Sequence, residues 1–261
     1  MILKHLAKVL HRQDWFVVFV EVAIVVVGIL IALEVQNWND ERLAQEEAAG
    51  WRHQILADLN QTRFDIEGRK QYNSEALAFG EEALALLDDD SVLDEASAWR
   101  LVLGAFQAGQ IWPYRLAGPA FRQAQNAGGL GLVAEPEVIV TLSYLYDVTA
   151  YDVELVSGGL PKYREMIRER LDWPLQEYIW DADCQATELN EGFVDYRFRL
   201  VHCERPQQPE QILASAEALR NDEALIRALR GRLSQLKISV ESLGRVIERV
   251  DNAIQQLETG Y

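Results

Sequence analysis

The chain has 261 residues, of which 49% are hydrophobic and 25% are charged, a composition typical of a folded protein rather than a disordered one. Its formal net charge is -16, from 25 Lys plus Arg against 41 Asp plus Glu, so nucleic acid is excluded as a partner because phosphate binding needs concentrated positive charge. With only 2 cysteines, no dense disulfide framework is expected, and the core must come from the apolar faces of helices.

Residues 1–14 form a basic segment that contains Lys4, Lys8 and Arg12. Apolar residues recur at helical spacing opposite these cations, which predicts a short amphipathic helix on the anionic inner leaflet of a membrane. A basic flank without structure fits the same residues.

An apolar run follows over residues 16–33 and is interrupted only by Glu21. Such a run reaches about 27 Å as a helix, which spans a bilayer core. Trp15 and Trp38 bracket it, as expected for rings that settle at the two membrane interfaces. No small-x-small cleavage site follows, so the pattern favours an uncleaved transmembrane helix over residues 15–38 rather than a signal peptide.

Charges on the two sides of this run predict its orientation. Basic residues precede it, whereas the flank after it begins with Glu34, Asn37, Asp40 and Glu41, so the positive-inside rule places the N-terminus in the cytoplasm. The sequence therefore predicts a single-pass protein of a bacterial inner membrane, with the lipid bilayer as one partner and residues 39–261 in the periplasm.

Glu21 is the most unusual residue of the span, because a carboxylate in hydrocarbon is costly unless it is protonated or paired. It either stays near the headgroups or contacts a polar group on another helix. Gly28 and Ala32, four residues apart, form a small-xxx-small groove that favours close approach of such a helix.

The pattern beyond the span predicts a mainly α fold, in which the membrane helix continues as a stalk over residues 34–70. A second helix is expected over residues 74–87, and Ser91 with Asp94 reads as a capping box that opens the next helix. The acidic cluster of residues 88–90 lacks the spacing of a calcium loop, which favours helix capping and solvation.

Residues 107–118 break the helical pattern, and Trp112, Tyr114 and Arg115 within them are candidates for lining a ligand pocket. A helix over residues 120–126 with glycines 128–129 as its C-cap is expected next, followed by an extended piece over residues 130–133. Helices are then expected over residues 136–156 and from residue 161 to Trp173-Pro174.

The segment of residues 181–209 is predicted to be irregular, and the period-two alternation of residues 196–200 indicates a short strand or an extended arm. Cys184 and Cys203 lie within it and are expected to form a disulfide in an oxidising compartment. The alternative is a metal site that adds Asp181, Asp183 and His202, although no paired ligand spacing supports it. A Cys-His nucleophile is less favoured still, and no cofactor is indicated.

Residues 210–258 give the clearest pattern, apolar residues at alternating steps of three and four that form a helix–helix seam. The partner is either the stalk of the same chain, as an antiparallel hairpin, or the same helix of a second subunit. The seam includes Leu233, Leu236, Val240, Leu243, Ile247, Val250 and Ile254.

Two blocks of the sequence resemble a bacterial family of uncharacterised single-pass membrane proteins. One block contains Glu21, residues 25–33 and residues 36–42; the other contains Phe121, residues 127–133, Leu142, Tyr144 and Tyr146. A glutamate recurs in the membrane helix of such proteins, so the resemblance implies a role for Glu21. It implies no activity and no ligand.

Three hypotheses for function follow. The favoured one is a non-enzymatic envelope protein that associates with itself or with another envelope protein through its stalk, heptad helix and membrane groove. The second is a ligand-binding or sensory module that acts through a partner, since a tail of about fourteen residues cannot hold an output domain. The third is a periplasmic hydrolase, for which no known motif is present.

Overall fold

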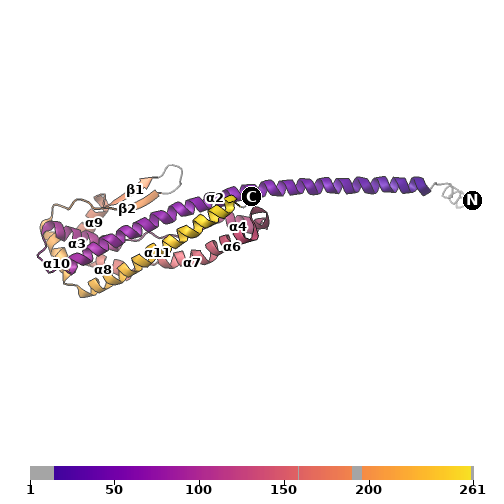
Figure 1. Ribbon diagram of the computed structural model, residues 1–261. Helices are drawn as coiled ribbons and strands as arrows, with labels where there is room; N and C mark the ends of the chain where they lie inside the picture. The colour runs from indigo at the N-terminus through magenta and orange to yellow at the C-terminus, as the bar shows by residue number, and fades with distance from the viewer. Residues whose placement is uncertain (1–14, 158, 190–195, 260–261) are drawn as a thin grey trace, which may run out of the picture. The chain divides into compact units, whose positions relative to one another are not determined.

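The computed structural model describes residues 15–157, 159–189 and 196–259 (Figure 1). The chain divides into two compact units, Met1–Trp51 and Arg52–Tyr261, whereas the sequence suggested a boundary at residue 38. Helix α2, Trp15–Leu87, contributes to both units. Lys4, Lys8 and Arg12 lie outside the described residues.

The described part of the first unit is the N-terminal part of α2. Among the described residues, this is the one helix long and apolar enough to cross a membrane. Its large apolar side chains are exposed, as are Trp15 (83%) and Trp38 (64%) at either end of the apolar run. A helix that is apolar on all sides and unburied within its own unit has the surface of a membrane span.

Helices and one small hairpin form the second unit. In chain order after α2 the elements are α3 Glu95–Ala108, α4 Pro119–Asn126, α5 Leu130–Val133, α6 Pro136–Ser143, the π-helical segment η1 Tyr144–Thr149, α7 Ala150–Ser157, α8 Lys162–Arg170, α9 Trp173–Asp181, β1 Gln185–Leu189, β2 Tyr196–Leu200, α10 Pro209–Arg220 and α11 Glu223–Thr259.

Within this unit α11 runs antiparallel to α2 (Figure 1). Two ion pairs show this direction. Near the start of α11, Arg230 contacts Asp88, just past the end of α2, at 2.9 Å; near the end of α11, Asp251 contacts Arg63, much earlier in α2, at 2.8 Å. The partner of the heptad helix is therefore the stalk of the same chain.

Helix α3 lies in the centre of the core, and its residues from Leu101 to Ala108 are all buried. Contact with α2 is so close at Gly104 that a Cβ there would lie 2.6 Å from the carbonyl oxygen of Phe79. Only glycine fits this crossing, because any side chain would push the two backbones apart.

The buried face of α11 is wider than the predicted seam. Leu236, Leu243 and Val250 are fully buried, but Val240, Ile247 and Ile254 are only partly covered, and Leu233 is 9% exposed. The residue that precedes each of these last four in the sequence is buried, namely Arg232, Ser239, Val246 and Ala253. The helix contacts α6, α7 and α8 as well as α2, so it buries more than a two-helix seam.

Several predicted boundaries are wrong. The stalk and the predicted helix over residues 74–87 are one continuous helix, and residues 130–133 are a short helix, α5, rather than an extended piece. The predicted helix over residues 210–258 is two helices, α10 and α11, because Asp222 starts a new one by accepting a hydrogen bond from the backbone N–H of Leu225 at 2.9 Å.

Two local signals were also misread. The capping box of α3 is formed by Asp94 and Ser97 rather than by Ser91 and Asp94, and Ser91 is held by Asp89 instead. Residues Trp173 and Pro174 begin helix α9 rather than end α8, because proline is tolerated in the first turn of a helix.

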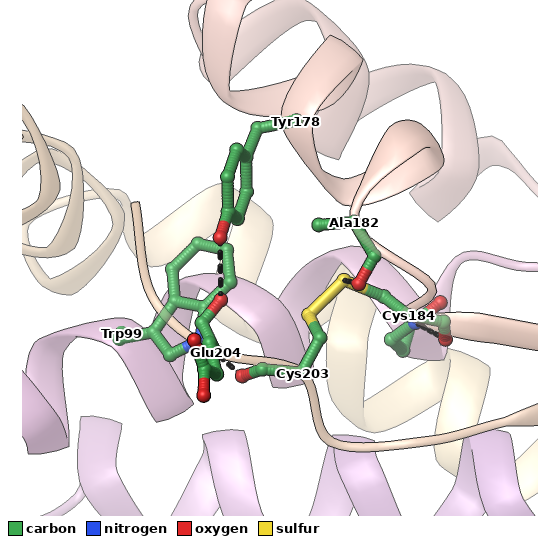
Figure 2. The surroundings of a disulfide bond; sticks show 7 residues. Trp99, Tyr178, Ala182, Cys184, Cys203 and Glu204 are labelled. Atoms are coloured by element: carbon green, nitrogen blue, oxygen red, sulfur yellow. Dashed lines mark hydrogen bonds between the residues drawn. A yellow bond between two sulfur atoms is a disulfide. The ribbon is translucent and has the colours of Figure 1, made fainter. Parts of the chain in front are cut away.

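The segment of residues 181–209 contains an antiparallel hairpin, in which Gln185 pairs with Leu200 and Leu189 with Tyr196. This confirms the predicted strand and adds its partner. A disulfide joins Cys184 to Cys203 just outside the hairpin, and the carbonyl of Cys203 accepts a hydrogen bond from the indole of Trp99 (Figure 2). The bridge fastens the hairpin to the core.

Candidate functional site

Trp112 and Tyr114, the predicted pocket residues, surround a side chain of the protein itself. The guanidinium of Arg69 lies 4.2 Å from the ring centroid of Trp112 and 4.3 Å from that of Tyr114. Trp112 also contacts Phe198 edge to face, at 5.0 Å between ring centroids. Arg115 is exposed and pairs with Glu154. These residues form a cation–π cluster, and neither cavity described in this unit includes them in its lining.

Glu21, Gly28 and Ala32 lie on one exposed face of α2, since they are separated by seven and four residues. A Cβ on Gly28 would meet no atom within 4 Å. This face is open within its own unit, and the structure shows no partner for it among the described residues.

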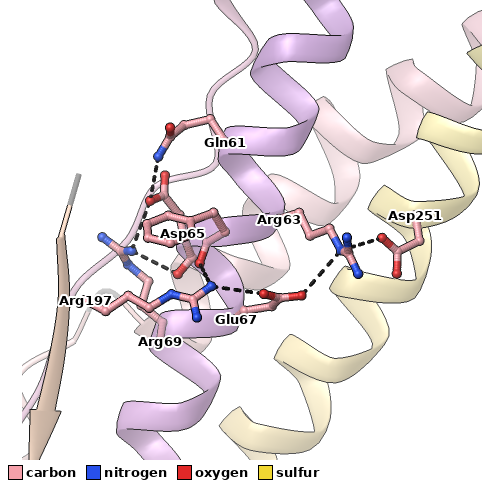
Figure 3. Close-up of polar contacts among 8 residues, drawn as sticks. Gln61, Arg63, Asp65, Glu67, Arg69, Arg197 and Asp251 are labelled. Carbon is pink, nitrogen blue, oxygen red and sulfur yellow. Dashed lines mark hydrogen bonds and ion pairs between the residues drawn. The ribbon is translucent and has the colours of Figure 1, made fainter. Parts of the chain in front are cut away.

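Most charged side chains that bridge elements of the second unit have partners of opposite sign. Figure 3 shows such a network, in which Glu67 of α2 lies between Arg63 and Arg197 and Arg63 also contacts Asp251 of α11. These contacts join α2 to β2 and to α11. One cluster of arginines in this unit differs, because no carboxylate among the described residues pairs with it.

Such a cluster lies where α8 and α11 meet the C-terminal end of α3. Arg164 donates a hydrogen bond to the side-chain oxygen of Gln110 at 2.8 Å, and Arg168, one turn further along α8, approaches the same oxygen at 3.4 Å. Arg232 of α11 donates to the backbone carbonyl oxygens of Ala108 at 3.0 Å and Gln110 at 2.9 Å. Three guanidinium groups therefore converge on one glutamine.

Part of their role is structural. Arg232 and Arg164 cap the free carbonyl groups that follow α3, including that of Gly109 at 2.9 Å from Arg164. A helix C-terminus carries only about half a negative charge, however, so capping leaves most of the charge of three guanidinium groups uncompensated.

No carboxylate in the described part of the chain forms an ion pair with Arg164, Arg168 or Arg232. Burial, and secondarily the nearby Arg164, lower the pKa of Arg232 to about 10. Burial also lowers the pKa of Arg164, with the charge of Arg168 as the next cause. All three remain charged at neutral pH, so the cluster concentrates positive charge inside a strongly acidic protein.

Gln110, at the centre of the cluster, has a hydrogen-bond donor that no described residue accepts from. The residue is 3% exposed, and its buried amide nitrogen has no hydrogen-bond partner among the described residues, while its oxygen is fixed by the two arginines of α8. Turning the amide over would aim N–H groups at guanidinium groups, so the orientation is set. A buried donor without an acceptor costs about 1–3 kcal/mol.

Tyr72 of α2 completes the surroundings. It is 3% exposed, and burial raises its pKa, against the opposing influence of the charges of Arg164, Arg232 and Arg168. The hydroxyl therefore stays protonated. The carboxylate of Glu75, which also acts on Tyr72, is held elsewhere by a hydrogen bond from the backbone N–H of Leu200 at 2.8 Å and by Arg199.

A cavity of about 310 Å³ adjoins the cluster and shares Arg232 with it. The rest of the described lining comes from residues 159–161, before α8, and from Gln235, Ile238 and Ser239 of α11. Arg232 makes no hydrogen bond through Nη1 within the described part of the chain, since its described bonds use Nε and Nη2.

The chemistry of the cluster is that of anion binding. Guanidinium groups bind phosphate and carboxylate oxygens through strong charge-assisted hydrogen bonds, and the free amide of Gln110 adds another donor. The described side chains that form the cluster are Arg164, Arg168, Arg232 and Gln110, whose groups are hydrogen-bond donors suited to holding an anion.

The cysteines are unsuited to the metal or nucleophile alternatives, because the disulfide leaves no thiolate. The ring of His202 instead packs against that of Phe79, with 4.5 Å between centroids and a tilt of 45°, and its Nε2 lies 3.8 Å from the carboxylate of Glu82. Asp88 pairs with Arg230, and Asp89 accepts hydrogen bonds from Ser91, which lies outside any helix. In the described residues neither side chain caps a helix, since the N-cap of α3 is Asp94, so the predicted capping role of this acidic cluster is not found at these two residues.

Sequence reasoning missed the cluster. Arg164 and Arg168 are one helical turn apart, but such spacing is common on solvated helices. The available signal was Arg232, the charged residue among the described buried residues of α11.

Comparisons of the chain with known protein families, with curated proteins and with solved structures gave no match. The resemblance to a bacterial family of single-pass membrane proteins stays a prediction, and the function has to be argued from the residues.

Proposed function

We propose that this chain is a non-enzymatic, membrane-anchored protein of the bacterial envelope whose helical second unit binds a small anion. In this proposal residues 15–38 cross the inner membrane once, with the basic residues 1–14 in the cytoplasm and the second unit in the periplasm. The observation that carries the binding function is the convergence of Arg164, Arg168 and Arg232 on Gln110 without a carboxylate.

The energetic argument is that buried charge needs a counter-charge. Removing a guanidinium from water costs several kcal/mol unless it is paired; this applies most to Arg232, which is buried, and less to Arg164 and Arg168, which are half-buried, and like charges add repulsion. Elsewhere in the unit the chain supplies the carboxylate, as Glu67 does for Arg197 at 3.0 Å. An anion taken from solution would fill the same role in the cluster, and it would also accept from the free amide of Gln110.

The test is calorimetric titration of the full chain, held in lipid nanodiscs, with inorganic phosphate at low ionic strength. We expect saturable binding that weakens tenfold or more in Arg168→Gln, because one charge-assisted hydrogen bond contributes about 1.5–3 kcal/mol. Arg168 is chosen because its side chain caps no helix and makes one hydrogen bond among the described residues, the 3.4 Å contact with Gln110. Its guanidinium also lies over the rings of Phe106 at 5.5 Å and Trp180 at 5.3 Å, so the free energy of unfolding of the variant is measured alongside its phosphate affinity.

The matched control is Arg230→Gln, which removes the same charge from an exposed position of α11 paired with Asp88. It should leave phosphate affinity within about twofold, while Arg168→Lys should retain more affinity than Arg168→Gln because it keeps the charge. Absence of saturable binding, or an equal loss in Arg230→Gln, would rule out the site.

A second candidate function is association with another copy of the chain or with another envelope protein. The open face of Glu21, Gly28 and Ala32 favours it, because a membrane helix with a small-residue groove allows close approach of a second helix. The heptad helix contributes less than the sequence suggested, since its seam is buried against α2 of the same chain.

Crosslinking in native membranes tests this candidate. We expect a fixed oligomer or partner to be trapped and the yield to fall in Gly28→Ile, which fills the groove. The control Val27→Ile changes an adjacent position on another face. An unchanged crosslinking pattern in Gly28→Ile would remove the groove from the proposal.

A further inference from the structure

The size of the cavity beside Arg232 indicates a ligand larger than a simple oxyanion. At about 310 Å³ it reaches the lower limit of ordinary small-molecule pockets, whereas a single bound water needs only about 10–15 Å³ of such space. An inorganic anion held by the guanidinium groups would leave most of that volume unfilled.

The lining of the cavity is divided by polarity. Arg232, Gln235 and Ser239 of α11 present polar groups, whereas Leu160, Pro161 and Ile238 present apolar ones. Arg232 is the charged residue among those described in the lining, and it joins the cavity to the cluster around Gln110.

Two of the apolar residues are unusually exposed for their type. Leu160 is 67% exposed and Ile238 is 57% exposed, although both border the same cavity. Apolar side chains that flank a charged binding group are covered favourably by the apolar portion of a ligand, because this removes their surface from water.

We infer that the ligand of this site is a single-chain amphipathic anion, with a phosphate or carboxylate head bound by Arg232 and its neighbours and an apolar chain lying over Leu160 and Ile238. This inference rests on the proposed anion-binding function and names its ligand class. Head and chain are recognised by different residues, so the two contributions can be separated by experiment.

The experiment compares inorganic phosphate with butyl phosphate, titrated into the full chain in nanodiscs. Burying one methylene group raises affinity about fourfold, and the open cavity covers only part of a four-carbon chain, so butyl phosphate should bind on the order of tenfold more tightly. Butanol, which lacks the charge, should show no saturable binding at the same concentrations.

Two variants assign the gain to the cavity. Ile238→Ser and Leu160→Ser should each bring butyl phosphate affinity down toward that of inorganic phosphate, while leaving the affinity for inorganic phosphate itself within about twofold. Val92→Ser is the matched control, since Val92 is 96% exposed and lies outside the described lining of this cavity.

The possible results separate this inference from the proposed function. Suppose that inorganic phosphate binds in an Arg168-dependent manner. If butyl phosphate then binds no more tightly than inorganic phosphate, or if it keeps its higher affinity in Ile238→Ser, the amphipathic ligand is ruled out and the anion site stands. If neither compound binds, both proposals fail. If butyl phosphate binds more tightly and the two serine variants remove the difference, the ligand class is supported.

Discussion

Gln110 offers a way to test the charge balance of the cluster without any ligand. Replacing it by glutamate keeps the shape of the side chain, retains an oxygen for Arg164 and Arg168, and replaces the unpartnered amide nitrogen with a negatively charged oxygen. We expect Gln110→Glu to raise the free energy of unfolding by about 1–3 kcal/mol at pH 7 and to weaken phosphate binding at least tenfold. Urea denaturation of the full chain in detergent measures the first effect.

The control is Gln107→Glu, three residues earlier on α3. Gln107 is 0% exposed and donates from its amide nitrogen to the carbonyl oxygen of Cys184 at 2.9 Å, with no arginine bonded to its own oxygen in the described residues. A carboxylate there would be buried, unpaired and opposed by a carbonyl, so stability should fall by about 3 kcal/mol or more. Destabilisation of similar size in both variants would contradict the charge argument.

The disulfide, the arginine cluster and the aromatic residues differ in how far the sequence could predict them. The disulfide between Cys184 and Cys203 was predictable, because two cysteines in a segment that is predicted to be exported have one pairing. The site at Gln110 was not, since it depends on three arginines contributed by two helices and on the absence of a nearby carboxylate. Neither fact is local in sequence. The aromatic residues around Trp112 instead suggested a ligand pocket, whereas the structure places the guanidinium of Arg69 over the ring of Trp112.

At the scale of elements, periodicity predicted the long helices α2 and α11, but it left open whether α11 packs on the stalk of the same chain or on a second subunit. It underestimated the width of the buried face, which also includes Arg232, Ser239, Val246 and Ala253; the first two are polar, so a hydrophobic pattern passes over them. The true face also includes contacts with α6, α7 and α8, and such three-sided burial broadens a seam beyond the positions that two paired helices require.

Boundaries between elements were predicted less well, for identifiable local reasons. A proline in Trp173-Pro174 is compatible with the end of one helix and with the first turn of the next, and the structure takes the second option. Asp222 interrupts the heptad pattern because it caps the new helix while also pairing with Arg170 at 2.8 Å. The N-cap itself is a local signal, since Asp222 accepts from a backbone N–H only three residues on, whereas its partner Arg170 lies 52 residues away and is not visible in a local window.

For the whole molecule, the N-terminal apolar segment and the disulfide are linked through the compartment in which the second unit folds. Disulfides form and persist outside the reducing cytoplasm, and the proposed topology exports every residue after the span. A bridge across a separation of 19 residues contributes about 3 kcal/mol on the loop-entropy model, so export would also stabilise the hairpin that it fastens.

The redox state of Cys184 and Cys203 therefore reports the topology in living cells. Cells are quenched in acid, and thiols are labelled with a maleimide that retards the protein on a gel. We expect the full chain to be labelled only after reduction, whereas a variant lacking residues 15–38 should stay in the cytoplasm and be labelled without it. Cys184→Ser provides the control, since its single thiol should label in both conditions. Labelling of the unreduced full chain at both cysteines would place the second unit in the cytoplasm and overturn the proposed orientation.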